Sequence, residues 1–407
     1  MKTVMTVYAS DYSSQLFRYG VYLETSHEDR FLLHAMLHPN AATVSKEQSK
    51  ILVEIQWRRI LGAVVFLLVC GWLASDAGVI PQRPFEEAQL YSDRFRNELQ
   101  TELRAAADSE GMVLMGSLSS AYIDLTFNWL ANLRVFGIDK HVVLIAEDLA
   151  SFKAIRQAQS GARVVLSDFG HKKTHGGVPN YADAEYWALT GTRPWYVSIA
   201  LDAGVTLVWS DQDIFYFQDI FKVFKNQLDS GKEMVFTIEG KWNGLCSGSF
   251  MIAPTFIGRK LVNYWKDTMR HRDDGFDQGA LNLALQRAFD FYPDARPKHE
   301  ILDEFTACSG LTLWRKGVCN VEELIFAHNN WIVGHWGKVQ RFYCNEMWAL
   351  PCMMAMEKGD KFLKTREEMI ENIDCSEVKT SNSSKLIRDV VQQARSVFPT
   401  CPFEESY

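Results

Sequence analysis

Two aspartates one residue apart, Asp211 and Asp213, give the clearest chemical signal in the sequence. They directly follow an apolar run, residues 205–209, that lacks alternation, as expected of a parallel strand buried on both faces. Ligands of open α/β sheets bind at the carboxyl ends of strands, and side chains at i and i+2 of an extended chain point to one side. The pair therefore predicts half of a Mg²⁺ or Mn²⁺ site with open positions for the phosphates of a nucleotide diphosphate. An ordinary solvated loop is the alternative, because short motifs often occur by chance.

The elements that must position this pair alternate between strands and helices from residue 111 onward. The pattern predicts strands at residues 112–115, 141–145, 164–166, 205–209, 234–238, 249–252 and 323–327, and helices at residues 121–136, 187–203, 257–269 and 278–289. At Pro194, the helix at residues 187–203 is either broken or preceded by a turn. This βαβ rhythm is typical of an α/β fold. Neither a Gly-x-Gly-x-x-Gly loop nor a Walker lysine is present, so a bound nucleotide is held without the usual glycine loop.

Composition sets the class of protein. The 407 residues are 47% hydrophobic and 13% aromatic, which is enough for one large or two smaller globular cores. The net charge of −7 excludes a generally basic surface, so we expect no nucleic-acid partner.

The amino-terminal region predicts a membrane anchor. Residues 1–59 show no convincing helix or strand periodicity and are expected to be a cytosolic tail, whereas residues 60–74 are uninterrupted by charge. A span of roughly 20 residues requires residues 75–80 as well, so we predict a short transmembrane signal anchor at residues 60–80. Arg58 and Arg59 place the amino terminus in the cytosol. A buried core helix is the alternative, but the charged residues 81–110 resemble a stem that offers it no partner.

The cysteines favour an oxidising compartment. Cys70 lies in the predicted span, and the remaining seven all follow residue 240 without the paired Cys-x-x-Cys spacing of a zinc site. A few disulfides with one thiol left over fit this number. The sequon that begins at Asn382 is compatible with glycosylation there.

Several stretches together resemble the nucleotide-diphospho-sugar transferase domain of glycosyltransferase family 77, whose members include plant pectin xylosyltransferases and extensin arabinosyltransferases. The resemblance covers about residues 112–350, and the order and spacing of the blocks carry it. The blocks are Ser210-Asp211-Gln212-Asp213, Ser247-Gly248-Ser249-Phe250, Asp277-Gln278 with Asn282, and His328-Asn329-Asn330-Trp331 followed by Lys338 and Arg341.

The resemblance implies a GT-A fold, a Rossmann-like, mixed and mainly parallel sheet with flanking helices, in a catalytic domain at residues 111–350, followed by a luminal extension at residues 351–407. It implies a type II Golgi membrane glycoprotein that transfers a sugar from a nucleotide diphosphate, expected to be a UDP-sugar, to a glycan or glycoprotein. The implied reaction is metal-dependent, with Mn²⁺ or Mg²⁺, and retaining.

The resemblance also assigns roles to residues. Asp213 is the expected principal metal ligand, Asp211 faces the ribose or a metal-bound water, and His328 supplies a third ligand or a structural hydrogen bond. The metal stabilises the leaving diphosphate. Lys338 and Arg341 hold the same phosphates unless they lie solvated on a helix surface. Asp277 and Gln278 approach the sugar or acceptor as catalytic groups, or Asp277 serves as an amino-terminal helix cap.

Two rival functions use the same residues. A phosphatase of the haloacid dehalogenase type also places its nucleophile in an Asp-x-Asp after a buried strand, with Asp273 and Asp274 imitating its second metal-binding pair. The mid-chain position of the motif and the missing strand before Asp273 count against it. An inactive luminal glycan-binding protein is the other rival, and the intact Asp211, Asp213 and His328 count against that one.

Overall fold

The computed structural model describes residues 5–10, 18–23, 91–158, 160–168, 184–239, 244–272, 276–332, 334–357, 360–365, 375, 385–397 and 402. The chain divides into two units, Met1–Pro81 and Gln82–Tyr407. In the first unit, β1 (Met5–Ser10) pairs antiparallel with β2 (Arg18–Leu23). The sequence predicted no strand in this region.

The predicted membrane span at residues 60–80 lies outside the described residues, as does Asn382. Among the helices that the structure does describe, none combines the length and the apolarity that crossing a bilayer requires.

A seven-stranded mixed sheet forms the centre of the second unit, in the order β10-β8-β9-β6-β3-β4-β5. Strand β9 runs antiparallel to both its neighbours, and the other four pairings are parallel. The expectation of a mixed, mainly parallel sheet is thus confirmed. The strands are β3 (Met112–Leu118), β4 (Val142–Ala146), β5 (Arg163–Leu166), β6 (Thr206–Ser210), β8 (Met234–Ile238), β9 (Leu245–Ile252) and β10 (His299–Ile301).

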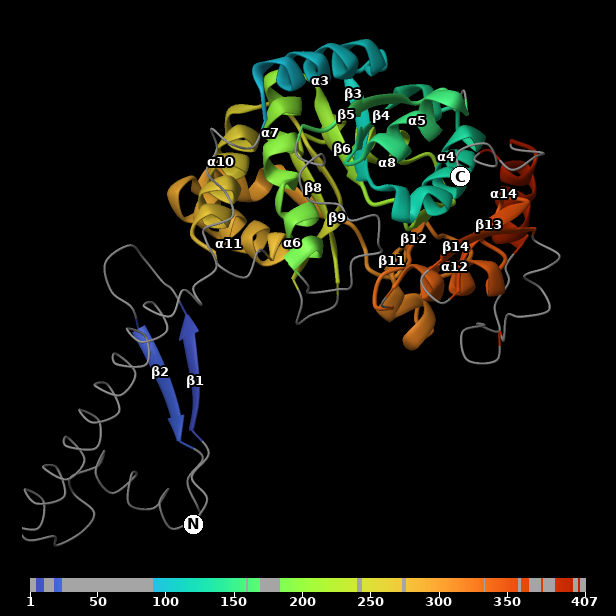
Figure 1. Cartoon of the computed structure of the whole chain (residues 1–407). Coiled ribbons are helices and arrows are strands. Elements are labelled where there is room, and N and C mark those ends of the chain that lie inside the picture. Colours follow the sequence, from blue (N-terminus) through green and yellow to red (C-terminus); the bar gives the residue numbers. More distant parts are fainter. Residues whose placement is uncertain are drawn as a thin grey trace, which may run out of the picture. The chain divides into compact units, whose positions relative to one another are not determined.

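Helices cover both faces of this sheet (Figure 1), and alternate residues of each central strand enter two separate cores. Val113 and Met115 of β3 pack with α3, α7, α10 and α11, whereas Leu114 packs with α4, α5 and α8. Burial on both faces explains why the strands read as continuous apolar runs. The helices are α3 (Asp93–Ala106), α4 (Ile123–Val135), α5 (Leu149–Gln157), α6 (Ala184–Gly191), α7 (Arg193–Asp202), α8 (Ile220–Asp229), α10 (Phe256–Arg270) and α11 (Asp277–Phe291). Pro194 lies in the first turn of α7, where its missing N–H costs nothing.

Helix α3 differs from the expectation for residues 81–110. Phe95, Leu99 and Leu103 recur every fourth residue, lie buried, and pack in the same core as α7 and β4. The surrounding charges conceal this stripe, so the sequence suggested an unpartnered stem. Ser92 caps the helix by accepting a hydrogen bond from the backbone N–H of Phe95. Residues 93–106 therefore belong to the folded unit.

A second, three-stranded sheet has the order β11-β12-β7, with β7 (Ile214–Tyr216), β11 (Ala307–Ser309) and β12 (Phe326–His328). Strand β12 pairs antiparallel with β7, and His328 lies opposite Ile214. The sequence predicted a strand at residues 323–327, which overlaps β12, but it predicted neither β7 nor β11. This sheet brings distant residues to the carboxyl end of β6.

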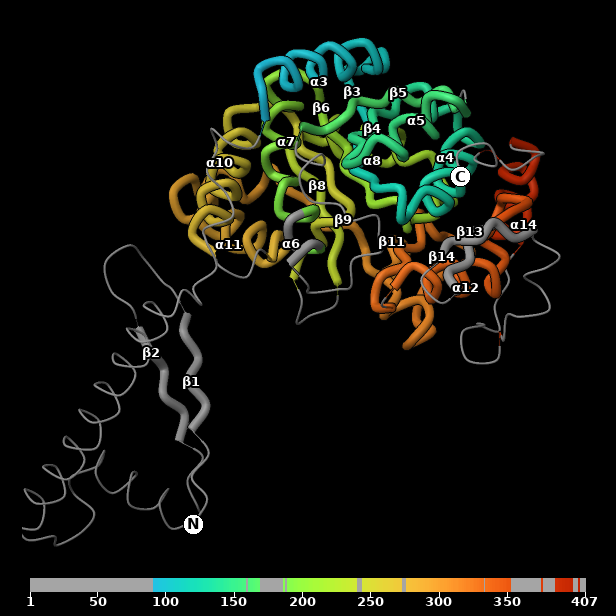
Figure 2. The backbone as a smooth tube through the Cα atoms, in the orientation of Figure 1, coloured from blue at the N-terminus to red at the C-terminus, as the bar shows by residue number. Residues whose placement is uncertain are grey.

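Residues after this sheet pack in the core that contains α4, α5 and α8. Figure 2 shows α14 (Lys385–Arg395) beside α4, and Ile387 and Val391 are buried there. Cys308 is disulfide-bonded to Cys319 and Cys344 to Cys375, and Cys352 is also disulfide-bonded. The free thiol among the described residues is Cys246, which is buried.

The remaining elements are η2 (Ser120–Tyr122), η3 (Asp139–His141), η5 (Pro293–Lys298), a π-helical turn η6 (Leu311–Arg315), α12 (His335–Cys344), and the antiparallel pair β13 (Cys352–Glu357) and β14 (Asp360–Thr365).

Candidate active site

The two aspartates lie in a tight connection between the two sheets. Strand β6 ends at Ser210, the chain turns at Gln212, and β7 begins at Ile214. The chain therefore turns between Asp211 and Asp213 and does not stay extended there. The turn is fixed from both sides, because the Asp211 N–H donates to the Gly248 carbonyl at 2.8 Å and the Asn329 N–H donates to the Asp213 carbonyl at 2.7 Å.

His328 completes a cluster with these carboxylates. Its Nε2 lies 3.3 Å from Asp213 Oδ1 and 4.0 Å from Asp211 Oδ2. Asp213 and His328 are buried, whereas Asp211 is partly exposed. Ligands in neighbouring positions of an octahedron with bonds of ~2.1 Å lie about 3 Å apart, close to the observed distances. The three residues thus fit a Mg²⁺ or Mn²⁺ ion.

Gly248 leaves room for the side chains of Asp211 and His328 to lie close together. A Cβ atom at this position would lie 2.5 Å from Asp211 Oδ2 and 2.7 Å from His328 Cε1, so any other residue would push both side chains away. The glycine of the Ser-Gly-Ser block is required by this close approach.

Lys338, on α12, contacts the same aspartate. Its Nζ lies 2.5 Å from Asp213 Oδ2, and it lines the cleft in front of the cluster. Burial disfavours ionisation of Asp213, but Lys338 and His328 outweigh burial and lower the pKa of Asp213 below its ordinary value. Burial likewise disfavours the imidazolium of His328, yet Asp213 outweighs it and raises the pKa of His328. A metal would displace this proton from His328.

Arg193 is a functional candidate that sequence reasoning missed. Its Nη1 donates to Asp277 Oδ2 at 2.7 Å and to Ser247 Oγ at 2.7 Å, and its Nη2 lies 3.0 Å from Asp211 Oδ1. The guanidinium also lies over the Trp209 ring, 5.0 Å from its centroid. A cation at the first residue of a helix opposes the helix dipole, and this conflict is the signal that could have revealed it. Arg193 holds Asp211 in place.

Asp277 and Gln278 lie behind the cluster, not in the cleft. Asp277 is buried in the ion pair with Arg193 and is the first residue of α11, so it is not the cap. Gln278 Oε1 accepts from the Ser247 N–H at 3.3 Å. Neither residue lines the cleft, in contrast to the catalytic role expected for them.

Arg341 is also engaged elsewhere. Its Nη1 donates to the Asn330 carbonyl at 2.8 Å, and the guanidinium lies 4.9 Å from the Trp314 ring centroid. It holds the loop after β12 and does not line the cleft, so of the two predicted phosphate ligands only Lys338 faces it. Asp273 and Asp274, the pair that a phosphatase would need, lie outside the described residues.

The cleft has a volume of about 140 Å³ and lies at the carboxyl ends of β3, β4 and β6. Its walls are built by the end of β3 and the segment after it, by Glu147 after β4, by α6 and α7, by the turn after β6 and by Lys338. The lining residues are Ser117, Leu118, Ser119, Tyr122, Leu125, Glu147, Tyr186, Leu189, Thr190, Arg193, Asp211, Gln212, Asp213 and Lys338. This is the edge of an α/β sheet at which ligands bind.

Glu147 is a second residue that the sequence did not reveal. It lines the cleft directly after β4 and is only 1% exposed. The Tyr196 hydroxyl donates to its Oε1 at 2.9 Å, and Oε2 has no hydrogen-bond partner among the described residues. Burial raises the pKa of Glu147 to about 7, against the opposing hydrogen bonds of Tyr196 and Ser167. The cleft therefore contains a carboxyl group that is partly protonated at neutral pH.

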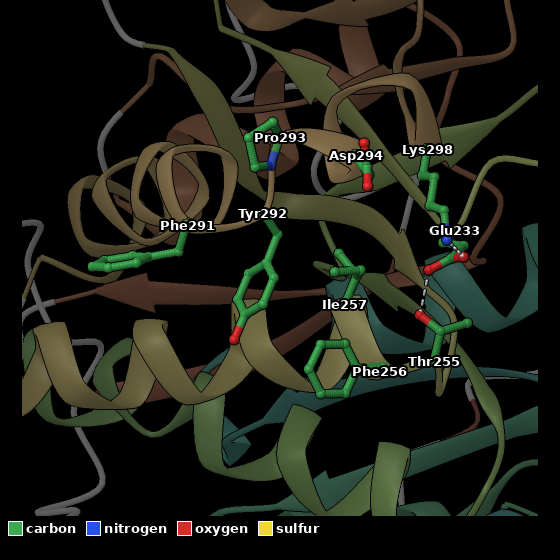
Figure 3. Close-up of a pocket in the computed structure, with 9 residues that line it drawn as sticks. All are labelled: Glu233, Thr255, Phe256, Ile257, Phe291, Tyr292, Pro293, Asp294 and Lys298. Atoms are coloured by element: carbon green, nitrogen blue, oxygen red, sulfur yellow. Dashed lines mark hydrogen bonds and ion pairs between the residues drawn. The ribbon is translucent and has the colours of Figure 1, made fainter.

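A larger hollow of about 330 Å³ lies at the opposite end of β8 and β9 (Figure 3). Aromatic rings of Phe256 and Tyr292 line it, and three of its polar side chains hydrogen-bond to one another. Glu233 accepts from Lys298 at 2.7 Å and from Thr255 at 2.6 Å. It contains none of the metal-ligating cluster.

The chain is similar in sequence to known proteins, and its structure aligns in part with a solved one. Residues 137–342, about half of the chain, match the model of the family described as nucleotide-diphospho-sugar transferase. A UDP-D-xylose:L-fucose alpha-1,3-D-xylosyltransferase of Arabidopsis thaliana is 21% identical over 270 residues, covering 60% of this chain and 70% of the relative. The enzyme numbered 1 of the same name and organism is 21% identical over 322 residues, covering 72% and 86%. The apo crystal structure of mouse xyloside xylosyltransferase 1 aligns with a TM-score of 0.33 and 14% identity over 54% of this chain and 98% of that one.

Proposed function

The chain belongs to the nucleotide-diphospho-sugar transferase family, and from this membership and its cleft we propose that it is a metal-dependent, retaining transferase that uses a UDP-sugar. It is a glycosyltransferase related to UDP-xylose xylosyltransferases, so UDP-xylose is the first donor to test. We propose a glycan or glycoprotein as the acceptor. The observation that carries the proposal is the convergence of Asp211, Asp213 and His328 at the carboxyl end of β6, with Lys338 beside them.

The charges of the cluster suit the departure of a diphosphate. In the transfer, the bond between the anomeric carbon and the β-phosphate oxygen breaks and its electron pair leaves with the diphosphate. The acceptor hydroxyl forms the new bond to that carbon on the face from which the diphosphate departs, as retention requires, and passes its proton to the departing diphosphate. Asp211, Asp213 and His328 would hold the metal, which when bound stabilises the charge on the leaving group. Lys338 is placed to contact the same phosphates, and Arg193 fixes the carboxylate of Asp211.

A luminal location is part of the proposal. Disulfides at Cys308–Cys319 and Cys344–Cys375 support an oxidising compartment. Residues 60–80, which are mainly apolar with Asp76 near one end, support a single anchor. We propose a type II protein of the Golgi membrane.

The test is a screen of the full-length protein, purified in detergent, against a panel of nucleotide sugars. We expect Mn²⁺-dependent hydrolysis or transfer with UDP-xylose or another UDP-sugar, and loss of it after chelation. An Asp213→Asn protein is the matched control. Absence of Mn²⁺-dependent nucleotide binding by a folded wild-type protein would overturn the proposal, and an anomeric assignment of the product by NMR tests retention.

A further inference from the structure

His328 has a second set of potential metal ligands on the side away from the cleft. Its Nε2 faces Asp213, whereas its Nδ1 lies 3.6 Å from Cys246 Sγ. The Cys246 thiol in turn donates to Glu239 Oε1 at 2.9 Å. One ligand atom from each of Glu239, Cys246 and His328 lies within 4.8 Å of the others.

This second set differs chemically from the first. Asp211 and Asp213 offer only hard carboxylate oxygens, which suit Mg²⁺ and Mn²⁺, whereas a thiolate, an imidazole and a carboxylate suit Zn²⁺. A tetrahedral Zn²⁺ with bonds of ~2.3 Å to sulfur and ~2.0 Å to nitrogen holds these two ligands about 3.5 Å apart. The observed separation of 3.6 Å between Cys246 and His328 matches that value. The distance of 2.9 Å from Cys246 to Glu239 must widen when the ion replaces their hydrogen bond.

Asn330 lies between two of these ligands, Glu239 and His328. Its amide Nδ2 lies 2.5 Å from Glu239 Oε1 and 3.3 Å from His328 Nδ1, so an N–H donor bridges two of the three ligand atoms. Glu239 is only partly buried, which gives the set contact with solvent, whereas Cys246 and His328 are buried.

We propose that Glu239, Cys246 and His328 form a Zn²⁺ site that competes with the metal of the cleft. Three protein ligands leave the fourth tetrahedral position to water, and the thiol of Cys246 releases its proton to solvent as the Zn–S bond forms. The Asn330 amide turns away from the ligands it now bridges.

Competition follows from the chemistry of one imidazole ring. A neutral imidazole has one nitrogen with a free lone pair, and the other carries the proton. When His328 binds Zn²⁺ through Nδ1, its Nε2 carries the proton and donates to Asp213, so it is lost as a ligand in the cleft. This consequence, though not the Zn²⁺ site itself, rests on the proposed function.

The site can be tested with Co²⁺, which reports thiolate coordination by a charge-transfer absorption band. Full-length protein in detergent is stripped with a chelator and titrated with Co²⁺, then with Zn²⁺. We expect the band at one equivalent in the wild type and in Cys70→Ser, the matched thiol control, and its loss in Cys246→Ser, which keeps a donor for Glu239. Glu239→Gln is the second variant and should weaken the band. Absence of the band in the wild type, or its persistence in Cys246→Ser, would overturn the site.

Competition is measured separately, as the Mn²⁺ concentration needed for half-maximal UDP binding. Zn²⁺ should raise that concentration by about tenfold or more in the wild type and leave it nearly unchanged in Cys246→Ser. A cobalt band without this shift would refute the competition. If the proposed function fails instead, the band appears but Mn²⁺-dependent UDP binding is absent from every protein.

Discussion

Asp213 and His328 lie 3.3 Å apart because β7, which begins directly after Asp213, pairs with β12, which ends at His328. Ile214 of β7 lies opposite His328 of β12, and the Asn329 N–H donates to the Asp213 carbonyl. A slip of one residue in this pairing would turn the imidazole to the other face of the sheet. The third ligand is thus positioned by the pairing of two three-residue strands.

The first prediction is that Asp213→Asn abolishes Mn²⁺-dependent binding of UDP. The change removes one charge that faces the metal while leaving the side-chain volume nearly the same. Loss of several kcal/mol of leaving-group stabilisation should reduce transfer by about a thousandfold or more, since each ~1.4 kcal/mol is a factor of ten. Asp211→Asn should reduce transfer less. UDP binding with and without Mn²⁺ is the measurement.

The same change leaves Lys338 without its partner, so stability needs its own control. The double variant Asp213→Asn/Lys338→Met removes both charges of the pair. It should unfold at a higher denaturant concentration than Asp213→Asn alone, yet remain unable to bind UDP with Mn²⁺. Equal Mn²⁺-stimulated binding by wild type and Asp213→Asn would remove Asp213 from the site.

The second prediction concerns Gly248→Ala. The added Cβ would approach Asp211 Oδ2 to 2.5 Å and His328 Cε1 to 2.7 Å, so both ligands must move. We expect the affinity for Mn²⁺ to fall by about 10- to 100-fold, as for other changes that misplace ligands. Isothermal titration with Mn²⁺, alongside a thermal unfolding curve, separates this effect from a loss of fold. Unchanged Mn²⁺ affinity in a folded variant would contradict the geometry.

The sequence predicted much of the fold because its main elements are long or uniformly apolar. Strand β6 and helix α10 were placed within about two residues, since buried parallel strands and amphipathic helices leave strong patterns. Helix α3 was missed, because Phe95, Leu99 and Leu103 are separated by charged residues that resemble a stem.

The candidate site was predicted in part. Asp211, Asp213, His328 and Lys338 do converge, because they lie at strand ends or on a helix that faces them. The roles of Asp277 and Arg341 could not be predicted, since an ion pair with Arg193 and a bond to the Asn330 carbonyl arise only from tertiary packing. Glu147 follows a buried strand as Asp211 does, but a single carboxylate there gives no pattern.

The third prediction is that Arg193→Lys impairs both stability and donor binding. One ammonium cannot span Asp211, Ser247 and Asp277 as the guanidinium does. Disturbing a buried ion pair should lower the free energy of unfolding by about 2 to 4 kcal/mol. Arg259→Lys is the matched control, because Arg259 pairs with Asp202 at an exposed site where pairs contribute about 0 to 1 kcal/mol. Denaturant unfolding of both variants measures the difference, and equal losses would argue against a positioning role for Arg193.

The fourth prediction is topological. If Arg58 and Arg59 keep the amino terminus in the cytosol, residues 81–407 lie in the lumen. In sealed microsomes this part should resist added protease, and Asn382 should carry a glycan that Asn382→Gln removes. Digestion of the carboxyl-terminal part in intact vesicles would contradict the type II orientation.

The last prediction uses the pKa of Glu147, which burial raises from 4.5 to about 7. The groups facing this carboxyl are Tyr196 and Ser167, which hydrogen-bond, and Asp148, whose charge raises the pKa further. Because the folded protein binds this proton more tightly than the unfolded chain, the resulting stabilisation is complete below about pH 4.5 and is lost as the pH rises through 7. A pKa raised by this much adds about 3 kcal/mol at most to the free energy of unfolding.

Glu147→Gln replaces the protonated carboxyl by a neutral group of the same shape. Above pH 7 the wild type must hold a buried charge that the variant lacks, so the variant should be more stable at pH 8, by about 1 to 2 kcal/mol. At pH 5 this advantage should vanish, because Glu147 is then protonated in the folded wild type. Denaturant unfolding of both proteins at several pH values between 5 and 8 measures the difference. A difference in stability that does not change with pH would show that Glu147 titrates near its ordinary value and is not the proton-bearing group of the cleft.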